Sequence, residues 1–168
     1  RRRGLRVEHH RAIGLSLERD GARELQLRGQ PSLDMLRARQ QNRLAVISQL
    51  QGVHHIWVPE QSIDNLDLFY GLGIRMAQLT HRHTTALGST CEHLDDGGLT
   101  LEGKEAVRRM NELGVVVDLA HAGRRTSLET IEASREPVIN SHTACERIFD
   151  DADNRNIDDE YLKFILWQ

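Results

Sequence analysis

Aromatic residues, cysteines and long apolar runs are all scarce in this chain of 168 residues. Phe, Trp and Tyr together supply only 4% of the residues, so aliphatic side chains must fill most of the core. Cys91 and Cys145 lie far apart without a CxxC context, which excludes a disulfide framework and predicts two free thiols. No segment approaches the ~20 apolar residues of a membrane span, and no apolar stretch follows the basic N-terminus as in a secretory signal. These absences favour a cytoplasmic protein without a membrane span.

Charge is distributed unevenly along the chain. Residues 1–43 contain 11 Arg and 5 acidic residues, whereas residues 44–168 carry a net charge of −9. A basic arm can bind nucleic acid, but these arginines alternate with Glu, Asp and Leu and have no aromatic residues among them, which favours a solvated helix face. We therefore expect no nucleic-acid partner. The pattern predicts an Arg-rich helical region over 1–43, with Ser32 capping a helix to residue 43, and a second domain over 44–168.

Short β-branched segments alternate with helical patterns from residue 44 onward. The expected strands are 44–50, 74–79, 115–119 and 138–140, and the expected helices are 62–71, 101–113, 126–134 and 157–167. This alternation predicts a parallel α/β fold built from βαβ units, either a barrel or an open doubly wound sheet. No Gly-rich phosphate-binding motif follows any strand, which counts against a nucleotide-binding open sheet.

Capping residues mark two of these helices. Thr100 is expected to begin one helix and Gly114 to end it, and Thr126 with Glu129 has the spacing of a capping box. The polar stretch 80–99 is long for a simple connection, and loops of this length are often functional.

Polar residues stand directly after each expected strand. They are Gln51 with His54, His81, His121, and Ser141 with His142. Functional residues gather at the carboxyl ends of parallel strands, and imidazole is a common ligand of Zn²⁺. His121 and His142 are the leading metal-ligand candidates. Asp118 is either a partner that supports a ligand or a simple strand carboxylate, and His81 with His83 forms an alternative pair of ligands.

Three strings in this chain are similar to strings of the membrane dipeptidase family, peptidase family M19. They are LDLFYGLGIRMAQLTH at 66–81, GLTLEGKEAVRRMNELGVVVDLAH at 98–121, and SREPVINSH at 134–142, followed by Arg155-Asn156. The resemblance covers roughly residues 44–160. It implies a zinc-dependent dipeptidase on a (β/α)₈ TIM-like barrel of the metal-dependent hydrolase type, with two metal ions in the family.

The resemblance also assigns roles to individual residues. His121 and His142 match two metal ligands, His81 matches the histidine that binds the substrate or polarises its scissile carbonyl, and Arg155 matches an arginine that binds the substrate carboxylate. Gln51 stands where the family has a metal-bridging Glu. A neutral amide lacks the negative charge that offsets the repulsion between two cations.

Two further parts of the family's site have no counterpart in the sequence. The His-x-Asp pair of the family's first strand is absent, and the late Asp would lie beyond Gln168. Because a complete (β/α)₈ barrel has roughly 250 residues, the motif order predicts the middle section of a longer barrel.

Two hypotheses about function follow from the sequence. The first is hydrolysis of dipeptides or similar small amides by metal-activated water, with His81 stabilising the developing oxyanion and a homodimer left open. The second, motivated by Gln51, is a non-hydrolytic or single-metal relative that binds a small molecule.

Overall fold

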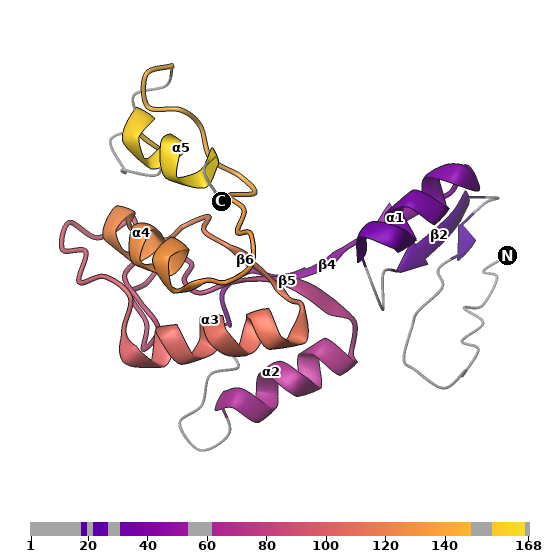
Figure 1. Cartoon of the computed structure of the whole chain (residues 1–168), viewed down its shortest axis with the longest axis horizontal. Helices are drawn as coiled ribbons and strands as arrows, with labels where there is room; N and C mark the ends of the chain where they lie inside the picture. Colours follow the sequence, from indigo (N-terminus) through magenta and orange to yellow (C-terminus); the bar gives the residue numbers. More distant parts are fainter. Residues whose placement is uncertain (1–17, 20–21, 27–30, 54–61, 149–155, 167–168) are drawn as a thin grey trace, which may run out of the picture.

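A parallel three-stranded sheet forms the centre of the molecule (Figure 1). The computed structural model describes residues 18–19, 22–26, 31–53, 62–148 and 156–166. The central sheet has the order β4-β5-β6, with parallel pairing throughout. Its strands are β4 (Ser48–Leu50), β5 (Ile74–Gln78) and β6 (Val116–Asp118). The helices are α1 (Pro31–Gln40), α2 (Ser62–Gly71), α3 (Leu101–Leu113), α4 (Arg124–Ala133) and α5 (Asp159–Leu166).

Neighbouring strands of the central sheet are also neighbours along the chain. Helix α2 lies between β4 and β5 in sequence, and α3 lies between β5 and β6. Beyond α4, Ile139 continues the series as an isolated parallel bridge to Asp118 of β6, so the expected strand 138–140 is reduced to one bridge. In a β/α barrel the strands lie side by side in chain order, with a helix after each strand. In a doubly wound sheet the spatial order of the strands reverses at one point, so the observed order is that of a barrel.

The segment expected as one buried strand, 44–50, is divided between two sheets. Its first half is β3 (Leu44–Val46), which pairs in parallel with β2 (Ala22–Gln26), and its second half is β4. The prediction of burial is wrong for the first half, because Leu44 is 56% exposed and Ile47 is 40% exposed. An apolar strand is buried only where another layer covers it, which local sequence does not reveal.

The sequence predicted an Arg-rich helical region over 1–43, but this region also contains strands. Strand β1 (Glu18–Arg19) pairs antiparallel with β2, so residues 18–26 contribute strands. Helix α1 begins at Pro31, which places Ser32 inside the helix rather than at its N-cap. Proline suits the first helical position because its missing N–H has no partner there. The pairing of β2 with β3 crosses the expected boundary at residue 43.

The apolar core lies between the central sheet and helices α2 to α5. Side chains from every layer contribute to it, including Leu66, Ala77, Val107, Met110, Val117, Leu119, Ile131 and Tyr161. Almost all are aliphatic, as the shortage of aromatic residues predicted. Met110 is fully buried on the inner face of α3, opposite charged residues that pair along the outer face.

Helix α3 has the ends that its sequence predicts. The Thr100 side chain accepts a hydrogen bond from the Gly103 N–H at 2.9 Å and caps the first turn. Gly114 ends the helix in the left-handed region, with φ of 72°. Both predictions are confirmed.

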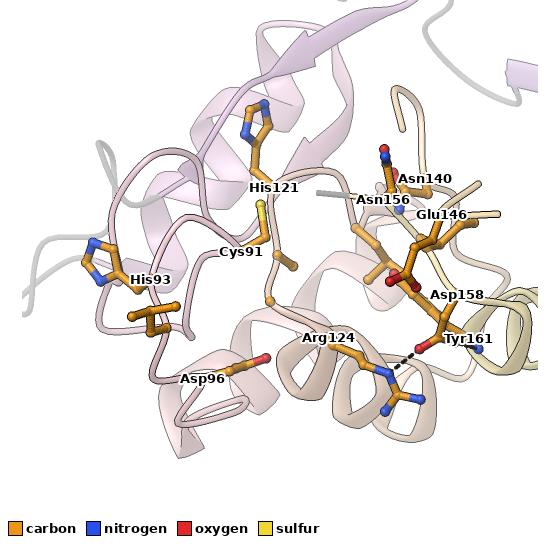
Figure 2. A pocket seen from close by; sticks show the side chains of 15 residues that line it. Cys91, His93, Asp96, His121, Arg124, Asn140, Glu146, Asn156, Asp158 and Tyr161 are labelled. Atoms are coloured by element: carbon orange, nitrogen blue, oxygen red, sulfur yellow. Dashed lines mark hydrogen bonds and ion pairs between the residues drawn. The ribbon is translucent and has the colours of Figure 1, made fainter. Parts of the chain in front are cut away.

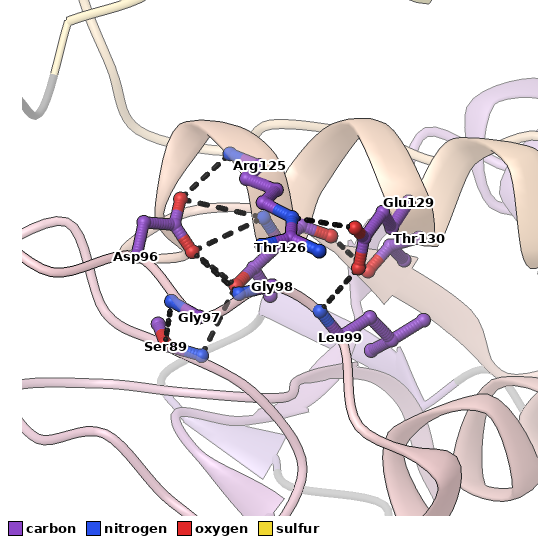
Figure 3. Close-up of polar contacts among 9 residues, drawn as sticks. All are labelled: Ser89, Asp96, Gly97, Gly98, Leu99, Arg125, Thr126, Glu129 and Thr130. Carbon is purple, nitrogen blue, oxygen red and sulfur yellow. Dashed lines mark hydrogen bonds and ion pairs between the residues drawn. The ribbon is translucent and has the colours of Figure 1, made fainter.

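Helix α4 begins differently from the prediction. It begins at Arg124 after Gly123, so Thr126 is an internal helix residue and the expected capping box is wrong. The cap comes from Asp96 in the 80–99 loop, whose carboxylate accepts hydrogen bonds from the Arg125 N–H at 2.6 Å and the Thr126 hydroxyl at 2.8 Å (Figure 3). A Cβ at Gly123 would lie 2.4 Å from the Asp96 carboxylate, so glycine permits this approach.

Further hydrogen bonds attach the same loop to α4 (Figure 3). The Thr126 hydroxyl accepts from the Ser89 N–H at 3.0 Å, and Glu129 accepts from the Leu99 N–H at 2.7 Å. The Arg125 guanidinium and the Leu99 N–H hold the pKa of Glu129 below its usual value. Thr126 and Glu129 therefore bond to a loop that is distant in sequence, whereas the sequence predicted that they would cap their own helix.

Both cysteines are free thiols, as predicted. Cys91 is buried and Cys145 is half-buried. Within the described ranges, no helix combines the length and apolar character needed to cross a membrane.

The Asp96 cap generates a prediction about stability. We expect Asp96→Ala to lower the free energy of unfolding by about 0.5–2 kcal/mol, the usual cost of losing an N-cap side chain. Urea unfolding followed by circular dichroism measures the change, with Asp95→Ala as the matched control because Asp95 is exposed. Equal stability of the two variants would contradict the assignment of the cap to Asp96.

Candidate active site

Three histidines meet at the carboxyl end of the central sheet. His81 follows β5, His121 follows β6, and His142 follows the bridge at Ile139. The ring centroids of His81 and His121 are 4.5 Å apart, and those of His121 and His142 are 5.0 Å apart. The structure thus brings together the three histidines that the sequence selected, which we call the histidine cluster.

Gln51 joins the histidine cluster from the end of β4. Its side-chain Nε2 lies 3.3 Å from Nε2 of His121. The residue at the position of the family's bridging Glu is therefore next to an expected metal ligand. It presents an amide to that ligand, with no negative charge.

The backbone of His121 has an unusual conformation. Its φ is 67°, in the left-handed region that residues other than glycine rarely adopt. Such a conformation costs about 1–3 kcal/mol and persists only where surrounding contacts impose it. Here the His121 carbonyl accepts a hydrogen bond from the Cys91 N–H at 3.0 Å, and the Thr90 hydroxyl oxygen lies 3.1 Å from the same carbonyl oxygen.

Thr90 links two members of the histidine cluster. This fully buried residue has a hydroxyl that lies 2.7 Å from the carbonyl oxygen of His81, in addition to its contact with His121. Thr90 belongs to the 80–99 loop, which is also hydrogen-bonded to α4. The contacts between this loop and α4 therefore help to hold the residues that follow β5 and β6. The sequence contained no signal for this role, since Thr90 is one of several polar residues in an aperiodic stretch.

Asp118 connects the strands beneath the histidine cluster. The side chain of this buried residue accepts hydrogen bonds from the Gln49 amide at 2.5 Å, the Gln78 amide at 3.0 Å and the Ser141 hydroxyl at 2.6 Å. It also accepts from the backbone N–H groups of Ala120 at 3.1 Å and Ser141 at 2.9 Å. These donors come from β4, from β5 and from the segments that lead to His121 and His142. Asp118 is therefore a partner of the site, one of the two alternatives that the sequence left open.

The two imidazoles differ in their surroundings at Nδ1. Nδ1 of His142 lies 2.7 Å from the Ser141 hydroxyl, within hydrogen-bond distance, whereas Nδ1 of His121 is 3.8 Å from a carboxylate oxygen of Glu92, too far for a hydrogen bond. Contacts at Nδ1 orient an imidazole and leave Nε2 for a ligand. The sequence singled out Ser141 as a polar residue at a strand end but did not predict its contact with His142. Glu92, in the aperiodic 80–99 stretch, was not predicted to lie near His121.

A cavity of about 250 Å³ adjoins His121 (Figure 2). Helices α4 and α5 provide one wall, where Arg124 forms an ion pair with Asp158 at 2.6 Å. Tyr161 lines the cavity from α5, and burial raises the pKa of its phenol to about 12, against the opposing effect of the neighbouring Ser127 and Asn140 side chains. The tyrosine is therefore neutral over the physiological pH range.

Two of the remaining candidates, His54 and Arg155, fall outside the described residues, so the expected carboxylate-binding role of Arg155 stays a prediction. His83 is exposed, and the ring contacts that build the histidine cluster involve His81.

The donor chemistry fits part of a metal centre. Neutral imidazoles suit Zn²⁺ and related divalent ions, and the rings of His121 and His142 lie edge to face with their centroids 5.0 Å apart. Within the part of the chain that the structure describes, no group of three or more His, Cys, Asp or Glu side chains could hold a metal ion. A catalytic zinc normally has three protein ligands, so two imidazoles form an incomplete set.

A family model places this arrangement among known proteins. The model described as membrane dipeptidase, peptidase family M19, matches residues 19–167. An uncharacterized dipeptidase of Schizosaccharomyces pombe is 32% identical over 129 residues, which cover 74% of this chain and 30% of the relative. Dipeptidase 3 of Rattus norvegicus is 33% identical over 129 residues, which cover 73% of this chain and 25% of the relative. The chain thus spans less than a third of the length of these curated relatives.

Solved structures agree with this assignment. An amidohydrolase from Pseudomonas aeruginosa superposes with a TM-score of 0.75 and 32% identity, over 84% of this chain and 41% of that one. A metallopeptidase from Rhodobacter sphaeroides, solved with a phosphinate mimic of the dipeptide L-Ala-D-Ala, superposes with a TM-score of 0.71 over 82% of this chain and 39% of that one. At 20% identity the second likeness concerns the fold alone. The chain belongs to the membrane dipeptidase family, peptidase family M19, and forms part of its (β/α)₈ barrel.

Proposed function

We propose that this chain carries part of the active site of a zinc-dependent dipeptidase. The observation that supports the proposal most strongly is the adjacency of His81, His121 and His142, which come from three consecutive strand ends. Family membership supports hydrolysis of small peptides and a metal cofactor. The cavity of about 250 Å³ beside His121 also suits a small substrate.

His121 and His142 are the residues of this chain that would hold zinc. Their imidazoles lie beside one another, and the Ser141 hydroxyl at Nδ1 of His142 leaves Nε2 of that ring available as a ligand atom. A zinc ion bound there supplies a Lewis acid that polarises a peptide carbonyl and lowers the pKa of water. The other ligands would come from outside the described residues.

The other residues of the site would handle the substrate. His81 is next to His121, where its imidazole can donate a hydrogen bond to the carbonyl oxygen as negative charge develops on it. Arg155 would bind the free carboxylate at the C-terminal end of a dipeptide, since a guanidinium forms two parallel hydrogen bonds to a carboxylate. Holding the scissile carbonyl and the C-terminal carboxylate at the same time would orient the scissile bond.

A hydrolysis assay on the full-length protein tests the proposal. We expect cleavage of dipeptides with a free C-terminal carboxylate after zinc is restored to chelator-treated protein, and no cleavage before. We expect His142→Ala to lower kcat/KM by more than ~100-fold. Removing a residue that only hydrogen-bonds to a metal ligand already lowers metal affinity or activity 10- to 100-fold, and loss of the ligand itself should cost more. His83→Ala is the matched control because His83 is exposed. Absence of metal-dependent cleavage across a panel of L,L and L,D dipeptides would refute the proposal.

Gln51 favours a second candidate function. A neutral amide lies 3.3 Å from His121, at the position where the family resemblance implies a carboxylate that balances two cations. A relative that holds one ion, or that binds a small molecule without hydrolysing it, is consistent with this substitution. Two equivalents of zinc in the native protein would exclude this candidate, and one or none would favour it.

Restoring the carboxylate tests the effect of Gln51 directly. We expect Gln51→Glu to strengthen zinc binding at least tenfold, because a negative charge near His121 attracts the cation. Isothermal titration with zinc measures this change. Gln41→Glu is the matched control, because Gln41 is an exposed residue that follows α1 and adds the same charge away from the histidine cluster. Unchanged zinc affinity in Gln51→Glu would show that the amide does not limit metal binding.

A further inference from the structure

Ser141 stands between a buried carboxylate and a histidine of the cluster. Its hydroxyl oxygen lies 2.6 Å from Oδ2 of Asp118 and 2.7 Å from Nδ1 of His142. Its backbone N–H also donates to Oδ1 of Asp118 at 2.9 Å. Ser141 is thus fixed to Asp118 at two points, and its hydroxyl is the only atom that joins the carboxylate to the imidazole in these contacts.

The number of available hydrogens determines the direction of these bonds. Two side-chain amides and two backbone N–H groups already donate to the Asp118 carboxylate, which accepts at both of its oxygens. The Ser141 hydroxyl has one hydrogen, and a carboxylate acceptor takes it. The Ser141 oxygen must therefore accept from His142, so the hydrogen between them belongs to Nδ1 of His142.

We propose that Asp118 and Ser141 are positioning residues that hold His142 in the tautomer with hydrogen on Nδ1. The lone pair of Nε2 then points away from Ser141 and is available to a ligand. The identification of that ligand as zinc rests on the proposed function, whereas the tautomer follows from the contacts alone.

The burial of Asp118 makes this arrangement rigid. Asp118 is 1% exposed and holds amides from β4 and β5, so its carboxylate cannot turn away from Ser141 without leaving those donors unpaired. His142 itself is exposed. Besides its ring contact with His121, the hydrogen bond at Nδ1 is therefore the directional contact that orients this exposed imidazole.

Nuclear magnetic resonance on the metal-free, full-length protein tests the tautomer. At about pH 8, above the usual histidine pKa of about 6.5, long-range ¹H–¹⁵N correlations distinguish hydrogen on Nδ1 from hydrogen on Nε2. His142→Gln identifies the His142 signals. We expect the Nδ1–H pattern in the native protein and its loss in Ser141→Ala. The Nε2–H pattern in the native protein, or an unchanged pattern in Ser141→Ala, would overturn the inference.

Zinc titration tests the consequence for ligand binding. We expect Ser141→Ala to weaken zinc binding 10- to 100-fold, the usual effect of removing a residue that orients a metal ligand, and Ser141→Thr to restore it through its hydroxyl. Ser127→Ala is the matched control, because Ser127 is a buried serine of α4. Equal zinc affinities for Ser141→Ala and the native protein, or failure of Ser141→Thr to restore binding, would overturn the role of the hydroxyl.

The two experiments separate this inference from the proposed function. A native protein that binds no zinc but has the Nδ1–H tautomer would refute the zinc site and support the positioning of His142. A protein that cleaves dipeptides with zinc but has the Nε2–H tautomer would do the reverse.

Discussion

The carboxylate of Asp118 connects four consecutive segments at the carboxyl end of the central sheet. Donors from β4, from β5 and from the turns after β6 and Ile139 converge on this one buried side chain. A buried carboxylate is stable only when such donors replace the water that it has lost. The need to satisfy Asp118 therefore fixes the relative positions of the strand ends, and the histidines that follow those ends are brought together as a result.

The 80–99 loop provides the second constraint on the site. Asp96 caps α4 from this loop, and Thr90 holds the carbonyls of His81 and His121. These bonds explain how His121 keeps a φ of 67° despite its cost. The loop contacts and the Asp118 network both hold the backbone around the strand ends, so the histidine cluster depends on side chains far from it in sequence.

The features that the sequence predicted correctly are those that depend on residues close together in the chain. The Thr100 cap, the Gly114 stop and strands β5 and β6 depend on neighbouring residues, and the structure confirms them. The order of strand-end histidines was also visible, because parallel strands place their carboxyl ends at one edge. The division of residues 44–50 between two sheets, the strands at 18–26, the cap from Asp96 and the role of Thr90 depend on distant partners. A helix-compatible threonine such as Thr126 can serve as an N-cap or as a tertiary contact, and only the fold decides between them.

The proposed zinc site requires His121 and His142 to bind the same ion through their Nε2 atoms. Zinc-edge anomalous diffraction from crystals of the full-length protein grown with zinc would locate that ion. We expect an anomalous peak about 2.0–2.1 Å from Nε2 of both His121 and His142, the usual zinc–imidazole distance. Coordination through Nδ1 of either histidine, or zinc bound only elsewhere in the protein, would contradict the proposed site.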